Sequence, residues 1–160
     1  MENKTTSKKV KRGVKSGEDS VVPQGELWSS FYATAQHWQS DIEFFESELV
    51  FFRLLIDKNF SLLIEAGNID QTRRMASHVT NLEKERGALA VHVSKHLKHI
   101  AALMENPFAQ DAQHFKDEHA AIECEFADFI KNFRSIKSEV FKLNEQVVQS
   151  EKVKRLIDRT

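Results

Sequence analysis

The sequence predicts an all-α protein, an up-down-up antiparallel three-helix bundle with coiled-coil (heptad) packing and a disordered basic N-terminal tail. Two observations support this fold class. The 160-residue chain has only five glycines and two prolines. Apolar residues recur along it at alternating spacings of three and four, the period of a heptad seam. A β-rich fold needs a turn about every ten residues, so the scarcity of turn residues excludes sandwiches, barrels and doubly wound α/β folds.

Residues 1–25 are predicted to form the tail. They carry six basic side chains against three acidic ones, and valine is their only large apolar residue after the initiator methionine. Such a segment buries too little surface to offset the entropy of ordering it. The cationic stretch within residues 1–24 suits either a solubilising role or weak association with nucleic acid.

Residues 26–160 are predicted to form a single bundle domain, and its first helix spans about 26–66. One seam runs through it at spacings of three and four and ends before Gly67 and Asn68, a typical C-cap pair. The seam residues are Trp28, Phe31, Ala35, Trp38, Ile42, Phe45, Leu49, Phe52, Ile56, Asn59 and Leu63. Further apolar residues lie outside this seam, at Phe44, Phe51, Leu55, Phe60 and Leu62. This wider face predicts contact with a third helix, and any surplus would suit a homodimer.

Two more helices follow, at about 70–105 and 107–157. Asp70 is expected to cap the first of them, and Pro107 is expected to open the last. The second seam reads Met75, Val79, Leu82, Arg86, Leu89, Val93, His96, Ile100 and Leu103. The third reads Phe108, Ala112, Phe115, His119, Ile122, Phe126, Phe129, Phe133, Ile136, Val140, Leu143 and Val147. Short connections make consecutive helices antiparallel neighbours, and the last helix should overhang by about ten residues.

Four polar residues interrupt the seams: Asn59, Arg86, His96 and His119. Asn59 and Arg86 are interpreted as residues that set the register of the helices, with Arg86 reaching Glu48 or Glu125. Gly87 lies inside the second helix, where glycine costs about 1 kcal/mol relative to alanine. Its position suggests a close approach by a neighbouring group, or a bend.

Alignment of the three helices gathers six of the seven histidines at one end of the bundle. They are His37, His92, His96, His99, His114 and His119. Residues three or four apart share a helix face, so each helix can direct two ligands at one ion. The candidate ligands for a divalent transition metal are His96, His119, His92, His99, Asp41 and Glu118.

Three interpretations of this cluster stay open. In the first, the histidines are half-buried polar groups that bond to Asp41, Glu118 and one another, without a cofactor. In the second they form the metal site, and in the third they form a pH-responsive core that loosens below about pH 6.5, where imidazole titrates.

Two resemblances bear on these interpretations. The pairs His37/Asp41, His92/His96 and His114/Glu118 locally resemble hemerythrin-like proteins, which use four shorter helices. Ferritin-like sites need a Glu three residues before a His, and no histidine here has one. The stretch from His37 through Trp38 and Asp41 to Leu49 resembles an uncharacterised group of bacterial long-helix bundle proteins. That resemblance implies the fold and a bacterial cytosolic setting, and it implies no activity.

The predicted function is non-enzymatic, through contact with a protein partner or self-association as a homo-oligomer. The chain shows no nucleophile triad order, phosphate-binding glycine loop or nucleotide fingerprint. Its single cysteine, Cys124, has glutamates on both sides that disfavour a reactive thiolate. No apolar run approaches the ~18 residues that a membrane span needs, and a cytoplasmic location is expected. A metal-binding bundle and tail-mediated nucleic-acid association are the alternatives.

Overall fold

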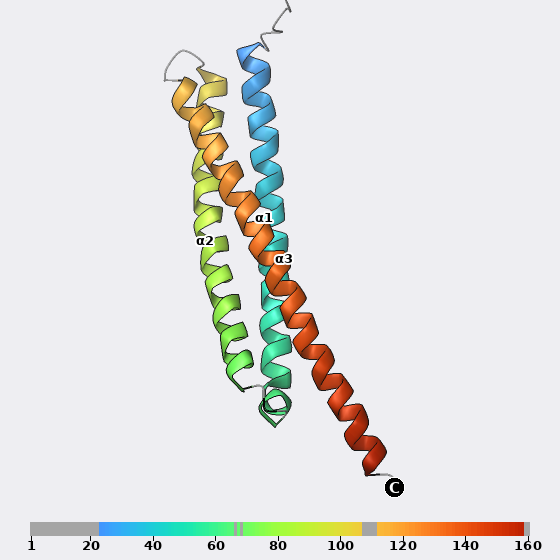
Figure 1. Cartoon of the computed structure of the whole chain (residues 1–160). Helices are drawn as coiled ribbons and strands as arrows, with labels where there is room; N and C mark the ends of the chain where they lie inside the picture. Colours follow the sequence, from blue (N-terminus) through green and yellow to red (C-terminus); the bar gives the residue numbers. More distant parts are fainter. Residues whose placement is uncertain (1–22, 66, 68, 107–111, 159–160) are drawn as a thin grey trace, which may run out of the picture.

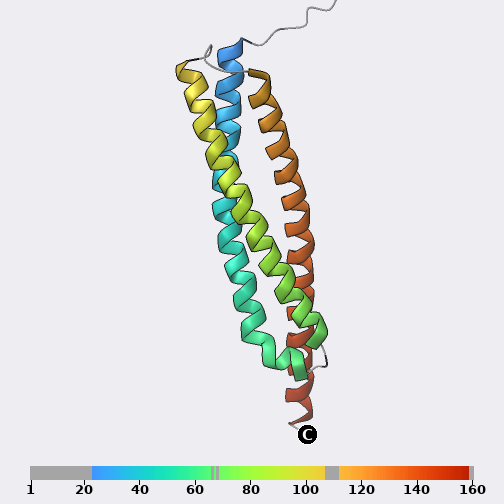
Figure 2. The same ribbon diagram turned by 90° about the vertical axis from the view of Figure 1, so that its left-hand side faces the viewer.

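The computed structural model describes residues 23–65, 67, 69–106 and 112–158, and confirms an all-α three-helix bundle. Helix α1 spans Gln24–Glu65, α2 spans Ile69–Glu105 and α3 spans Ala112–Ile157. The helices lie side by side, with α2 antiparallel to both others (Figures 1 and 2). The expected overhang is visible at the C-terminal end of α3, which projects past the turn between α1 and α2.

The helix ends differ from the expected ones by small, explicable amounts. Helix α1 begins at Gln24, inside the segment predicted to be tail, because the carbonyl of Pro23 accepts hydrogen bonds from the amides of Glu26 and Leu27 at 2.9 and 3.2 Å. Gly67 has a φ of 78°, a left-handed conformation that favours glycine after a helix. Asp70 lies within the first turn of α2 and does not cap it, although its charge still suits the positive end of the helix dipole.

Some expectations concern residues outside the described ranges. The tail lies almost entirely within residues 1–22, and Asn68, Pro107 and Phe108 also fall outside.

The core follows the predicted seams. Of the positions in the α1 seam, all but Phe31, Phe45 and Asn59 are buried, and those three are partly buried. Phenylalanine rings of α1 and α3 pack against one another: Phe45 lies 5.2 Å from Phe129 and 4.6 Å from Phe133, measured between ring centroids. This aromatic packing extends from the middle of the bundle toward the end that holds the histidines.

Gly87 corrects one expectation about α2. The helix runs unbroken from Ile69 to Glu105, and a Cβ atom added at Gly87 would meet nothing within 4 Å. No neighbouring helix or aromatic ring therefore requires glycine at this position.

Candidate functional site

His96 is the centre of a buried polar network near the connected ends of α2 and α3. Its side chain has no exposed surface, because it occupies a seam position between Val93 and Ile100. On α3, His119 occupies the equivalent seam position and is 7% exposed. Glu118 precedes it at the edge of the helix interface, with 19% of its side chain exposed.

The network is a continuous chain of hydrogen bonds. Nδ1 of His96 lies 2.8 Å from the Glu118 carboxylate, and its Nε2 lies 2.9 Å from Nδ1 of His119. Nδ1 of His99 also contacts the Glu118 carboxylate, at 3.0 Å. The Glu118 carboxylate is thus within hydrogen-bond distance of two histidines of α2, and His119 joins the network through His96.

This order of partners determines where the protons lie. A carboxylate only accepts hydrogen bonds, so Nδ1 of His96 must carry a proton. When the His96 ring is neutral, its Nε2 is the acceptor and Nδ1 of His119 is the donor. In that state His96 and His119 each have one defined tautomer, whereas a second proton on His96 would force His119 to change tautomer.

The surroundings shift the titration of two members of the network. Burial, and then repulsion from a charged His96, lowers the pKa of His119 to about 4. For Glu118, partial burial acts to raise the pKa, but the hydrogen bonds and charges of His99 and His96 outweigh it and lower the pKa below its ordinary value. At neutral pH the network therefore holds a carboxylate and a neutral His119.

Aromatic rings of α1 cover His119. The ring of Phe31 stacks on it at 3.8 Å with an interplanar angle of 1°, and Trp38 stacks at 4.8 Å and 29°. Both rings come from seam positions of α1, and the sequence analysis did not identify Phe31 as a partner of His119. The stack helps to bury His119, and this burial is the larger of the two causes of its lowered pKa.

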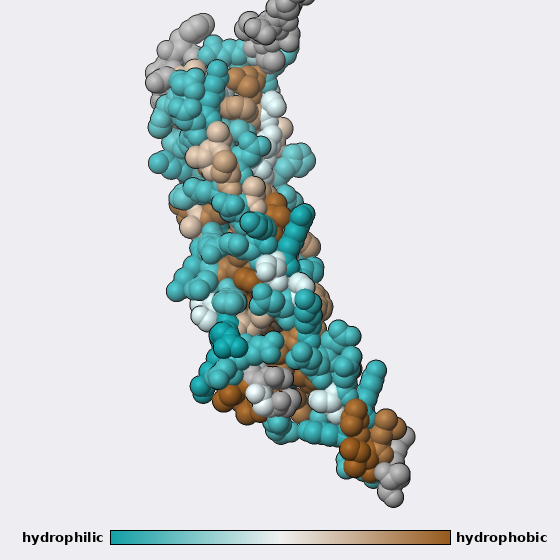
Figure 3. Space-filling model, in the orientation of Figure 1, coloured by the Kyte–Doolittle hydropathy of each residue, from teal (hydrophilic) through white to brown (hydrophobic). Residues whose placement is uncertain are grey.

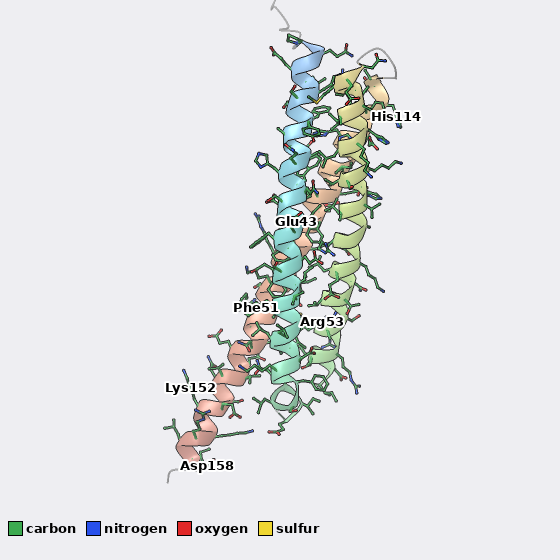
Figure 4. All side chains as sticks on the ribbon, turned by 180° about the vertical axis from the view of Figure 1, so that it is seen from behind. Glu43, Phe51, Arg53, His114, Lys152 and Asp158 are labelled. Carbon is green, nitrogen blue, oxygen red and sulfur yellow. The ribbon has the colours of Figure 1, made fainter. Side chains whose placement is uncertain are left out.

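The remaining predicted ligands lie apart from this centre. His92 is half-exposed and its Nδ1 lies 2.7 Å from Glu125, a partner that the sequence did not suggest. Asp41, His37 and His114 are all exposed. His114 lies on the outside of α3, near its start (Figure 4).

The geometry around His96 does not present a ready metal site. Within the described residues, no group of three or more His, Cys, Asp or Glu side chains is arranged to hold a metal ion. Both ring nitrogens of His96 already have protein partners. A metal ion bound by His96 and His119 would have to break the hydrogen bond between them.

The two polar residues interpreted as register-setting have specific partners. The side-chain amide of Asn59 donates to the side-chain carbonyl of Asn144 on α3, a partner that the sequence analysis missed. Arg86 contacts Glu46 at 3.3 Å, and not Glu48 or Glu125 as predicted. Positions two apart point in different directions on a helix. Glu46 therefore lies on the α2 side of α1, whereas Glu48 lies on the α3 side and binds Lys137 at 2.7 Å.

A second feature is an apolar strip on the outer surface where α1 and α3 meet. We define the strip by Phe44, Phe51, Leu55 and Leu62 of α1 and Phe141 and Val148 of α3. Spacings of seven and four along α1 keep its four residues on one face. Phe44, Phe51, Phe141 and Val148 are 55, 44, 43 and 46% exposed.

The strip lies on the α3 side of α1. Phe51 and Arg53 occupy opposite edges of this helix, with Arg53 directed toward α2 (Figure 4). The Phe141 ring lies 6.3 Å from that of buried Phe52, which joins the strip to the core. More apolar surface appears at the projecting end of α3 (Figure 3), where Val153, Leu156 and Ile157 are exposed.

No protein-family model, curated protein or solved structure matches this chain. None of the described helices is long and apolar enough to cross a membrane. Any functional argument must accordingly start from the histidine network and the apolar strip.

Proposed function

We propose that this chain is a cytoplasmic, non-enzymatic helical protein that acts through protein–protein contact, and that the apolar strip is its contact surface. The observation that carries the proposal is the exposure of Phe44, Phe51 and Phe141 beside a core that is already filled. Phenylalanine is among the side chains enriched at the centres of protein interfaces.

The size of the strip supports this assignment. A phenylalanine covers about 150–250 Å², so three rings exposed by roughly half leave about 300 Å² of apolar surface in water. Leu55, Leu62 and Val148 extend it. Contiguous apolar patches of a few hundred Å² typically mark interaction sites on proteins.

A capture experiment with matched variants tests the proposal. The wild-type chain, the variant Phe44→Ser/Phe51→Ser and the control Val91→Ser are immobilised separately and exposed to an extract of the source cells. Val91 is 64% exposed on α2, away from the strip. We expect the wild type and the control to retain the same proteins, including added copies of the chain itself, and the strip variant to lose them. Equal retention by all three, or retention by none, would refute the proposal.

The metal-binding alternative lacks an observation of comparable weight. His96 and His119 are close, but they bond to each other directly. Nucleic-acid association depends on the tail, nearly all of which lies outside the described residues.

A further inference from the structure

We infer that the occupant of the apolar strip is a second copy of this chain, forming a two-fold homodimer. The inference rests on the proposed function, because it names the partner for the same surface. Three observations carry it: the area of the strip, its internal charge balance and the near-neutral charge of the chain.

The area agrees with what a stable dimer needs. A standard interface buries about 800 Å² on each partner, and about 65% of a homodimer interface is apolar. Each copy must then supply roughly 500 Å² of apolar surface. The three exposed rings provide more than half of this, and the flanking Leu55, Leu62 and Val148 lie in the same strip. From Phe44 to Leu62 the strip runs for about 27 Å along α1, at 1.5 Å per residue.

Charge balance within the strip favours an apolar partner. The ammonium group of Lys137 lies 2.7 Å from the Glu48 carboxylate and 5.9 Å from the centre of the Phe141 ring. These two charges sit between the apolar side chains and neutralise each other, so covering the strip leaves neither ion without its partner. An acidic or basic partner would gain little from such a surface, whereas an identical strip matches it.

The overall charge does not oppose association. The chain has a formal net charge of −1 at pH 7, so two copies repel each other only weakly. A two-fold axis places the same patch on both copies, the commonest symmetry of soluble oligomers. Exposed rings of the two copies can then meet edge to face, the arrangement that aromatic pairs favour.

Sedimentation equilibrium of the full chain from about 1 to 100 μM tests the inference. We expect a species of twice the 18.5 kDa chain mass. Phe51→Ser/Phe141→Ser should weaken the dimer at least tenfold, and the control Val91→Ser should leave it unchanged. Circular dichroism confirms that each variant is folded. A wild type that stays monomeric at 100 μM, or a dimer that the double substitution leaves intact, overturns the inference.

Cysteine cross-linking keeps the test decisive if the double variant does not fold. In a Cys124→Ser background, Ser47→Cys places a thiol beside Phe44 and Phe51, and Ser94→Cys places one on the exposed side of α2. Oxidation should join Ser47→Cys chains into covalent dimers and leave Ser94→Cys chains monomeric. Equal or absent cross-linking counts against the dimer. If the chain is monomeric but still captures another protein through the strip, the dimer inference is wrong and the proposed function stands. If the chain neither dimerises nor captures a protein, both the inference and the proposed function are wrong.

Discussion

Lowering the pH from 7.5 to 5.5 should destabilise the bundle through His119. The unfolded side chain takes up a proton near its ordinary pKa of 6.5, whereas the folded one stays neutral until the pH reaches about 4. Between these values the unfolded state binds more protons, so the free energy of unfolding falls as the pH drops. The stability is fully present above pH 6.5 and is lost progressively toward pH 4.

The two pKa values determine the size of this effect. One pKa unit corresponds to about 1.4 kcal/mol, so His119 alone should account for a loss of about 1.4 kcal/mol at pH 5.5 and about 3 kcal/mol at pH 4. The pKa of Glu118 is lowered as well, so its contribution is present above its ordinary value of 4.5 and lost below it. A measurement at pH 5.5 therefore separates the contribution of His119 from that of Glu118.

Urea unfolding followed by circular dichroism at both pH values provides the assay, at one fixed protein concentration. His119→Gln removes the titrating group but keeps a hydrogen-bonding side chain, and should lose about 1.4 kcal/mol less than the wild type between pH 7.5 and 5.5. His37→Gln is the matched control, because His37 is exposed on α1 and is not one of the hydrogen-bonded residues of the network. It should behave as the wild type. If His119→Gln keeps the full pH dependence of the wild type, the assignment to His119 is wrong.

Three further predictions follow from individual contacts. Gly87→Ala should stabilise the protein by about 1 kcal/mol and raise the melting temperature by about 2–4 °C in a thermal scan, because the added methyl group meets open space; a lower melting temperature would contradict this. Asn59→Leu alone should lower the free energy of unfolding in urea by about 1–3 kcal/mol, because Asn144 loses its partner. Adding Asn144→Leu should recover most of that stability. If the losses of the two substitutions add, the pairing is refuted. Zinc added to tag-free protein should leave the melting temperature unchanged, because the ring nitrogens of His96 are already bonded; a saturable rise would support the metal interpretation.

The sequence was most informative where one physical effect dominates. Alternating spacings of three and four locate nearly every buried position, because burial of apolar side chains determines which face of each helix turns inward. The same pattern placed His96 and His119 in the seams, where both are buried. Periodicity thus predicted the fold and the centre of the candidate site.

The pairing of polar side chains was less predictable. Glu46 and Glu48 are both near Arg86 in height, and only the rotation of α1 about its own axis decides which one it meets. Asp41 was predicted to join the histidine cluster but is exposed, and Glu118 is the carboxylate that contacts His96. Long side chains reach several positions from one backbone site, so heptad spacing restricts these partners without selecting among them.

A double substitution can separate a structural role of the histidine network from a functional one. His96→Leu alone leaves Nδ1 of His119 without its partner and should cost about 1–3 kcal/mol at pH 7.5. His96→Leu/His119→Leu replaces both rings by apolar groups of similar shape, which is often neutral when a buried polar pair is removed completely. We expect the double variant to lie within about 1.5 kcal/mol of the wild type, the usual cost of a volume-conserving exchange, and to lose most of the pH dependence.

The outcome distinguishes two reasons for burying histidines in a heptad seam. If the double variant is as stable as the wild type, the bundle does not need the network to fold. The network then makes the stability depend on pH without increasing it at neutral pH. If His96→Leu and His119→Leu each lower the free energy of unfolding in urea and their effects add, the hydrogen bond between the two rings contributes little to stability. The stacks of Phe31 and Trp38 on His119 would then be the stabilising contacts, and His119→Phe, which keeps an aromatic ring there, should restore stability while His119→Leu does not.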